Sequence, residues 1–361
     1  MRVVVLGGYG NSGARICRAL AGDAEIEVIA AGRTPRDGDG ARIDLLSPDV
    51  PERLKALAPG LVIHCAGPFQ GQDYRVAAAA ISAGAHYLDL ADGRQFVSRF
   101  AAYNDEPARS ARVVAISGAS TVPALSSAVV DSLARRFRQI EEIQISIAPG
   151  QRAPRGAATM AGVLSYAGKP FKWLNDGAQV DAWGWQELRR LRFAGLGTRL
   201  AAACDIPDLE LFPSRYPGVK TVEFRAALEL RVQQLALWLV AALRRAGVPV
   251  PIERWASALS RLASLLDALG SERGGMLVSI GGTRADGGRT RLEWHLTADA
   301  NHGPEVPCMA AILLARKLAR AEISVSGAYP CMGFLTLSDF EPEFDRWGMM
   351  AVVETHEMRT T

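Results

Sequence analysis

The chain has 361 residues, of which 49% are hydrophobic and 22% charged, enough for two domains with ordinary buried cores. Its 41 basic and 38 acidic side chains nearly cancel, and no basic run covers a whole face, so we expect no nucleic-acid partner. The five cysteines are odd in number and widely spaced, without a CxxC pair, which favours a reducing, cytoplasmic environment.

Neither a secretory signal nor an integral membrane segment is expected. The first strand begins within two residues of Met1, which leaves no room for a signal peptide. The most apolar run, residues 235–243, is about half as long as the ~20 residues that a membrane helix needs, and we interpret it as part of a buried helix. The chain has no HxH, HExxH or clustered Cys/His motif, so no metal site is predicted.

Residues 1 to about 120 alternate between short apolar runs and segments with helical spacing. The alternation predicts a doubly wound parallel sheet, the hallmark of an α/β fold. The predicted strands are residues 2–6, 25–31, 61–66, 86–90 and 113–116. The predicted helices between them are residues 12–21, 51–57, 72–83 and 94–111.

The pattern changes after Ala119, where we expect a second, mixed α/β domain with an antiparallel sheet. A hairpin should pair residues 275–283 with residues 290–299 across a glycine-rich turn. The other expected elements are helices at 124–137, 227–246, 252–269 and 305–319, an alternating strand at 142–148 and a strand-like segment at 221–226.

A glycine-rich turn follows the first strand and opens the first helix. The segment Gly8-Tyr9-Gly10-Asn11-Ser12-Gly13 matches GxGxxG, and Gly7, Gly10 and Gly13 also satisfy GxxGxxG. Glycines let backbone amides approach a pyrophosphate, and the helix N-terminus adds a favourable dipole. The full strand–loop–helix context favours a Rossmann dinucleotide site over an empty turn.

The end of the second strand indicates which dinucleotide is preferred. An NAD-specific site usually has a carboxylate there, whereas this chain offers Arg33 and Thr34, which suit the 2′-phosphate of NADP. NADP is therefore favoured and NAD remains possible; the weaker alternative is that Arg33 is a solvated loop arginine. Asp44 is a candidate acceptor for the adenine amino group, with a turn aspartate as the alternative of equal weight.

The segment after the strand 61–66 should border the nicotinamide, because ligands of open α/β sheets bind beyond the carboxyl ends of the strands. Ala66, Gly67, Pro68 and Phe69 are the candidates there. Gly67 and Pro68 would shape the wall of the site. Phe69 would either pack beside the ring or anchor the loop to the core.

Three stretches together resemble the saccharopine dehydrogenase-like oxidoreductases, particularly their poorly characterised bacterial branch. The first stretch is the glycine-rich loop Gly7 to Gly13. The others are Ala66-Gly67-Pro68-Phe69 with Gly84-Ala85-His86-Tyr87-Leu88-Asp89, and Gly118-Ala119-Ser120-Thr121-Val122-Pro123-Ala124-Leu125-Ser126. The resemblance is specific over residues 1 to about 130 and only general beyond.

The resemblance implies an architecture and a class of chemistry. A Rossmann domain would span residues 1–123, a substrate and dimerisation domain 124–300, and a segment returning to the Rossmann domain 301–361. It further implies a homodimer and nicotinamide-linked hydride transfer at a C–N bond of a small-molecule amine, imine or amino-acid-like substrate. Fold analogy identifies no particular substrate.

Candidates for proton transfer lie on two parts of the chain. Tyr87 and Asp92 come at the end of the strand 86–90, on the rim where the nicotinamide should bind. Lys169, close to Tyr166, is the candidate from the second domain. His64 lies within an apolar strand, and we interpret it as a packed histidine.

Two other functions remain open at this point. The first is a non-catalytic dinucleotide-binding scaffold or regulatory protein, because binding and catalysis reside in separable sites. The second is a reductase of a larger apolar substrate, which would require the tryptophans to line a deep pocket rather than a core. The tryptophans in question are Trp173, Trp183, Trp185 and Trp238.

Overall fold

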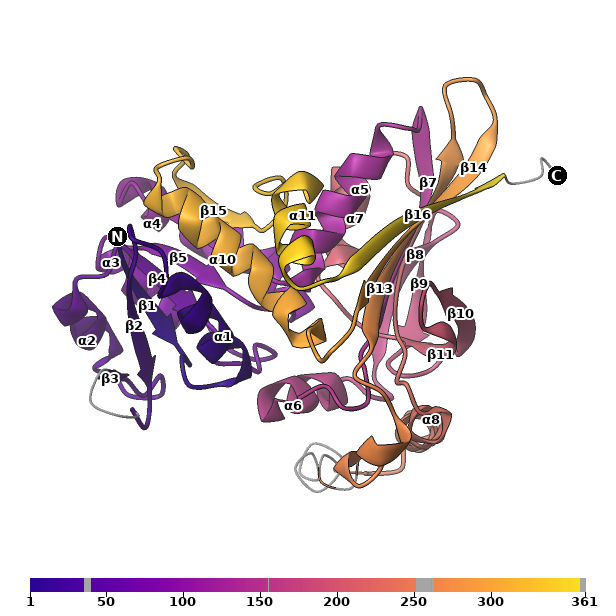
Figure 1. Ribbon diagram of the computed structural model, residues 1–361, viewed down its shortest axis with the longest axis horizontal. Helices are drawn as coiled ribbons and strands as arrows, with labels where there is room; N and C mark the ends of the chain where they lie inside the picture. The colour runs from indigo at the N-terminus through magenta and orange to yellow at the C-terminus, as the bar shows by residue number, and fades with distance from the viewer. Residues whose placement is uncertain (36–39, 155, 251–260, 262, 358–361) are drawn as a thin grey trace. The chain divides into compact units, whose positions relative to one another are not determined.

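A computed structural model describes the chain except for residues 36–39, 155, 251–260, 262 and 358–361. The chain divides into two compact units (Figure 1). We call Met1–Leu125 with Glu305–Leu335 the N-terminal unit, and Ser126–Pro304 with Thr336–Thr361 the mixed unit. Each unit therefore draws on two separate stretches of sequence.

The N-terminal unit contains a seven-stranded sheet in the order β15-β6-β5-β4-β1-β2-β3, with every pair parallel. Four of the five residues of β1, Arg-Val-Val-Val-Leu, are buried, as expected of a parallel strand covered on both faces. The strands are β1 (Arg2–Leu6), β2 (Glu27–Gly32), β3 (Ala41–Arg42), β4 (Leu61–His64), β5 (His86–Asp89), β6 (Val114–Ser117) and β15 (Gly327–Pro330). The predicted parallel sheet is confirmed.

Helices connect these strands, and one of them comes from the late part of the sequence. The helices are α1 (Asn11–Leu20), α2 (Val50–Leu57), α3 (Arg75–Ser82), α4 (Arg94–Ser110) and α10 (Val306–Ala319). Arg15 on α1 donates from Nε to Glu305 Oε1 at 2.8 Å, and Arg316 on α10 donates to Asp23 Oδ2 at 3.0 Å. Two partly buried ion pairs thus join α10 to α1 and to the turn that follows α1.

The mixed unit contains a nine-stranded sheet with the main order β10-β11-β12-β7-β13-β14-β16, from which β8 and β9 branch at β12. The strands are β7 (Gln139–Ala148), β8 (Pro170–Asn175), β9 (Ala178–Trp183), β10 (Arg189–Phe193), β11 (Gly197–Ala203), β12 (Thr221–Ala226), β13 (Gly274–Thr283), β14 (Arg289–Ala298) and β16 (Met350–Glu357). β12 and β7 are parallel, whereas the β13–β14 hairpin is antiparallel, as predicted. Both helices and a mixed sheet are present, which confirms the α/β class.

The two faces of this sheet differ in chemistry. Helices α5 (Ser126–Ala134), α7 (Asp208–Arg215) and α11 (Leu337–Arg346) pack against strands of the sheet or against one another. Trp294 is 2% exposed and its ring lies 6.2 Å from that of Phe344 on α11. Charged pairs such as Arg291–Glu142, at 2.7 Å, occupy alternate positions of the strands. The sheet therefore has an apolar core face and a polar face.

The end of the chain differs from the expected returning segment 301–361. Only Glu305–Leu335 joins the N-terminal unit, whereas residues 336–361 belong to the mixed unit. The reason is β16, which pairs antiparallel with β14 over eight residue pairs. The sequence pattern gave no sign of β16 or of the four short strands β8 to β11.

The interpretation of residues 235–243 as a buried helix is wrong. These residues lie in α8 (Arg231–Arg245), but Leu235, Leu239 and Leu243 are exposed. The buried side of α8 is formed instead by Gln234 and Ala241, and Gln234 Oε1 accepts the Leu228 N–H. Of the predicted helix 252–269, residues 252–260 and 262 lie outside the described residues.

Candidate functional site

The phosphate loop of the N-terminal unit is shaped by two glycines. Gly7 has φ +78°, in the left-handed region that favours glycine. A Cβ on Gly13 would collide with the carbonyl oxygen of Gly7, so this glycine allows α1 to start directly against the loop. The close approach of α1 to the loop is what the GxxGxxG spacing requires.

The N-terminus of α1 suits an anion. Its N-cap is Gly10, which has no side chain to cap the helix, and the first turn contains no acidic residue. Arg15 holds Asn11 by donating to its backbone oxygen at 2.7 Å, and it also contacts the Asn11 side chain. Within the described residues, the first turn of α1 thus sets no acidic side chain against its own amides and dipole, and the residues present fit a pyrophosphate.

Tyr9 connects the phosphate loop to the end of β2. Its hydroxyl donates to the Ala30 carbonyl at 3.2 Å, and its ring packs against Gly32, where an added Cβ would lie 3.0 Å from Tyr9 Cδ2. The exposed residues Arg33 and Thr34 follow immediately. An exposed arginine therefore lies at the carboxyl end of the second strand, beside the loop that would hold the phosphates.

Asp44 takes part in a turn. It is exposed, and its Oδ1 accepts the backbone N–H of Leu46 at 3.1 Å. This contact is typical of a turn aspartate, which was the alternative interpretation of Asp44 from the sequence.

A second loop, residues 66–69, lies against the phosphate loop. A Cβ on Gly7 would lie 3.1 Å from the backbone nitrogen of Ala66. Gln72 braces this second loop by donating from Nε2 to the carbonyls of Ala66, at 3.0 Å, and Pro68, at 2.7 Å. The bracing glutamine was not among the predicted residues, although it comes only four residues after Pro68.

Phe69 anchors this loop to the core. The side chain is 4% exposed, and its ring lies 5.0 Å from that of His64 and 5.4 Å from that of Phe96. The structure therefore favours the core-anchor interpretation of Phe69 over a position beside the nicotinamide ring.

Tyr87 is a core residue in this structure, contrary to the expectation that it lies on the rim. It is fully buried, stacks with Phe100 at 5.7 Å, and its hydroxyl lies 3.2 Å from His64 Nδ1. Burial lowers the pKa of His64 to about 4, so the ring is neutral. Tyr87 packs against Phe100 with no exposed surface, so it cannot exchange protons with a ligand from there.

Asp89, the last residue of β5, holds together the loops that follow β5 and β6. Its Oδ1 accepts the N–H groups of Ala91 and Gly118 and the hydroxyl of Ser117, at 3.0, 2.8 and 3.0 Å. Burial raises the pKa of this carboxyl to about 6, against the opposing effect of these donors. Asp89 therefore fixes the loops after β5 and β6 relative to one another.

Asp92 remains the partly exposed acid on this rim. Its Oδ1 accepts a hydrogen bond from Gln70 Nε2 at 3.1 Å, which ties it to the residue after Phe69. Burial raises the pKa of Asp92 above its ordinary value. A carboxyl with a raised pKa beside the predicted nicotinamide position is a candidate for proton transfer.

The remaining candidates belong to the mixed unit. Lys169 is exposed in the turn after α6 (Ala157–Ser165), where its N–H donates to the Tyr166 carbonyl. Trp173 is 5% exposed beneath the Arg225 guanidinium, and Trp185 is 1% exposed with its Nε1 donating to the Val163 carbonyl. These two tryptophans are packing residues, so they do not line a deep apolar pocket.

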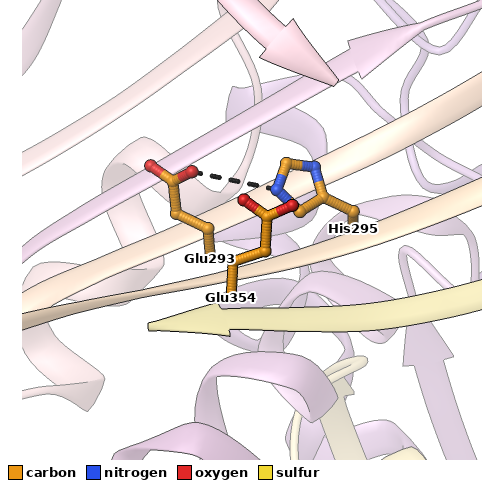
Figure 2. Close-up of side chains that lie close together, drawn as sticks. All are labelled: Glu293, His295 and Glu354. Carbon is orange, nitrogen blue, oxygen red and sulfur yellow. Dashed lines mark ion pairs between the residues drawn. The ribbon is translucent and has the colours of Figure 1, made fainter. Parts of the chain in front are cut away.

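One cluster in the mixed unit has the composition of a metal site. Figure 2 shows Glu293, His295 and Glu354, whose potential ligand atoms lie within 4.8 Å of one another. However, the Ala194 N–H donates to His295 Nδ1 at 3.2 Å, so in the neutral ring the proton sits on Nε2, 3.8 Å from Glu293 Oε2. A metal-ligating imidazole has the opposite arrangement, with its other nitrogen donating, so this donor set disfavours a metal ion.

Among the described residues, no helix is both long and apolar enough to cross a membrane. No family model matches the sequence, and none of the curated proteins matches it significantly.

Solved structures with the same fold span nearly the whole chain. Apo saccharopine dehydrogenase (L-Glu forming) from Saccharomyces cerevisiae has a TM-score of 0.65 at 13% identity, covering 98% of this chain and 99% of that one. Homospermidine synthase from Legionella pneumophila, in complex with NAD, has a TM-score of 0.59 at 10% identity, covering 100% and 92%. DAP dehydrogenase from C. glutamicum, in complex with DAP, has a TM-score of 0.51 at 15% identity, covering 95% and 98%. The chain thus has the fold of saccharopine dehydrogenase, as the sequence resemblance implied.

Proposed function

We propose that this protein is an NADP-linked oxidoreductase that transfers hydride at a C–N bond of an amine, imine or amino-acid-like substrate. The observation that carries the proposal is the phosphate loop, which leads into the uncapped N-terminus of α1 and packs through Gly7 against Ala66. Gln70, directly after the loop 66–69, holds the carboxyl of Asp92. Binding and proton-transfer groups therefore adjoin within one unit. The similar structures named above include dehydrogenases of amino-acid-like molecules, which supports this choice of chemistry.

Each part of the cofactor would be held by a different set of residues. Residues 7–13 and the start of α1 would hold the pyrophosphate, Tyr9, Arg33 and Thr34 the adenosine ribose phosphate, and Ala66 to Pro68 the nicotinamide end. When bound, the nicotinamide supplies or accepts the hydride. Asp92 would move the proton that accompanies formation or hydrolysis of the imine, and Gln70 would hold its carboxyl in position.

A screen for oxidation of NADPH tests the activity. The full-length protein is incubated with NADPH and mixtures of oxoacids and amines, and the absorbance of NADPH is followed. Once a substrate is found, Asp92→Asn should lower kcat by about 100-fold or more, with the dissociation constant of NADPH unchanged. Asp73→Asn is the matched control, since Asp73 is an exposed acid of the same unit, paired with Arg75 at 2.6 Å.

Two results would count against the proposal. Tight NADPH binding without turnover of any mixture would favour the non-catalytic scaffold. Full kcat in Asp92→Asn would move the proton-transfer role elsewhere, with Lys169 as the next residue to substitute.

A further inference from the structure

Helix α8 turns its apolar side away from the protein. Val232, Leu235, Leu239 and Leu243 recur at spacings of three and four residues, which places them on one side of the helix. They are 62%, 45%, 54% and 42% exposed. A surface helix of a globular protein ordinarily buries such a row, and an exposed apolar patch of this kind marks an interaction site.

The opposite side of α8 is fixed to the mixed unit. Gln234 is fully buried, and Gln186 Nε2 donates to the Trp238 carbonyl at 2.9 Å. A Cβ on Gly168 would lie 2.4 Å from the Ala241 carbonyl oxygen, so the backbone of the unit packs directly on this side of the helix. These contacts hold α8 in an orientation that leaves its apolar row on the surface.

The charge around this row is positive. Residues 230–266 contain five arginines and one acid, whereas the whole chain has 41 basic and 38 acidic side chains. Arg231 precedes the row, and Arg244 and Arg245 follow it in the last turn of α8. Arg231 lies at the end of the helix where the dipole disfavours a cation, so helix stability does not explain it. An apolar row with cations at both ends is typical of a helix that lies on an anionic lipid surface.

We propose that α8 lies flat on an anionic lipid bilayer, with its apolar row inserted among the lipids and its arginines at the headgroups. The row is about 16 Å long at a rise of ~1.5 Å per residue, and the 15 residues of α8 are too few to span a bilayer. Leu265 and Leu269, 76% and 71% exposed, lie on the adjoining segment, which Gln233 Nε2 of α8 contacts at the Ala263 carbonyl at 3.4 Å. Such binding is independent of the reaction in the N-terminal unit.

Charge disfavours a second copy of α8 as the occupant of this surface. Two such helices, parallel or antiparallel, would bring arginines together at both ends of the contact, and α8 contains no acid to pair with them. A convex helix face also needs a matching groove in a protein partner, whereas headgroups and acyl chains adapt to its shape. The lipid surface is therefore the occupant that fits both the shape and the charge.

Co-sedimentation of the full-length protein with vesicles tests the apolar row. The parent should bind phosphatidylcholine vesicles that contain about 30% phosphatidylserine roughly tenfold or more tightly than pure phosphatidylcholine vesicles. Leu239→Gln should lower the partition coefficient about tenfold, because an inserted apolar side chain is replaced by a polar one that is also a good helix former. Leu46→Gln, at a leucine that is 81% exposed in the N-terminal unit, should leave the partition coefficient unchanged.

A second pair of variants tests the arginines. Arg231→Gln should lower binding to the phosphatidylserine vesicles about fivefold, since one cation at the headgroups is lost, and should not alter binding to pure phosphatidylcholine. Arg18→Gln, which removes an exposed arginine from α1, should have no effect on either.

Several results would overturn the proposal. One is a parent that fails to sediment with anionic vesicles at about 1 mM lipid, and another is equal binding by the parent and Leu239→Gln. A urea midpoint that falls in Leu239→Gln but not in Leu46→Gln would instead show that residues 251–260 of the chain cover α8. A dimer that is present in the parent and lost in Leu239→Gln would show that a second copy does.

Discussion

Two arginines, Arg33 in the N-terminal unit and Arg225 in the mixed unit, show how differently the two sheets use charge. Arg225 is 4% exposed, lies 3.3 Å from Glu223 Oε2, donates to the Glu187 carbonyl and stacks over Trp173 at 5.0 Å. Arg33 is exposed just beyond the end of β2. The Arg225 guanidinium is thus buried in contacts within the mixed unit, whereas the exposed Arg33 is accessible to a ligand.

The difference follows from where each sheet puts its polar groups. The N-terminal sheet is buried on both faces, so its polar side chains collect at the carboxyl ends of the strands. The mixed sheet has a polar face, on which alternate residues of neighbouring strands neutralise one another, as Arg189 and Glu223 do at 3.0 Å. Changes in the mixed unit should therefore act on stability, and changes at the rim of the N-terminal unit on binding.

The largest effect is expected from Asp208 in the mixed unit. Its carboxyl is fully buried and accepts a hydrogen bond from the Ser126 hydroxyl, and burial raises its pKa to about 7. Because the folded pKa lies above the unfolded value, the carboxyl's stabilising contribution is complete below about pH 4 and disappears as the pH rises through 7. We expect a loss of about 2 to 4 kcal/mol over this range.

Asp208→Asn should flatten this dependence, because the amide oxygen still accepts from Ser126 without titrating. Urea unfolding at pH 4 to 8 measures the difference, and Asp181→Asn, at an exposed acid, should follow the parent. A parallel pH profile for parent and Asp208→Asn would show that Asp208 stays ionised in the folded protein.

The next effect concerns binding in the N-terminal unit. Gly13→Ala places a methyl group against the Gly7 carbonyl, which must shift the phosphate loop at a cost of about 1 to 3 kcal/mol. NADPH affinity, measured by fluorescence titration, should fall about 10- to 100-fold. Gly22→Ala is the control, since a Cβ there meets nothing within 4 Å. Equal affinities for both variants would mean that the cofactor does not bind at this loop.

The smallest effect is a change in the preference for NADPH over NADH when Arg33 is substituted. The parent should bind NADPH about tenfold or more tightly than NADH, since a guanidinium forms charge-assisted hydrogen bonds with a 2′-phosphate. Arg33→Asp should abolish or invert that ratio, whereas Arg18→Asp, with the same charge change at the far end of α1, should preserve it. An unchanged ratio in Arg33→Asp would show that the side chain points to solvent.

Sequence patterns were informative where they report local geometry. The phosphate loop and most strands of the parallel sheet follow from glycine spacing and apolar periodicity, and the β13–β14 hairpin follows from its glycine-rich turn. Tyr87 was misplaced because three of the four residues of β5 are buried, so the alternation along this strand does not show which side chains reach the rim. The contact of Gln70 with Asp92 and the three-donor role of Asp89 depend on contacts between loops, which no spacing in one segment encodes. The Gln72 contacts are local, but no motif marks a glutamine at that position.

The interleaving of the two units has a consequence for synthesis on the ribosome. Strand β15 and helix α10 of the N-terminal unit lie after most of the mixed unit, and β16 of the mixed unit lies after them. Neither unit can acquire its last strand until nearly all of the chain has been translated. Until then β6 and β14 are temporary sheet edges, at which the nascent chain is exposed to mispairing.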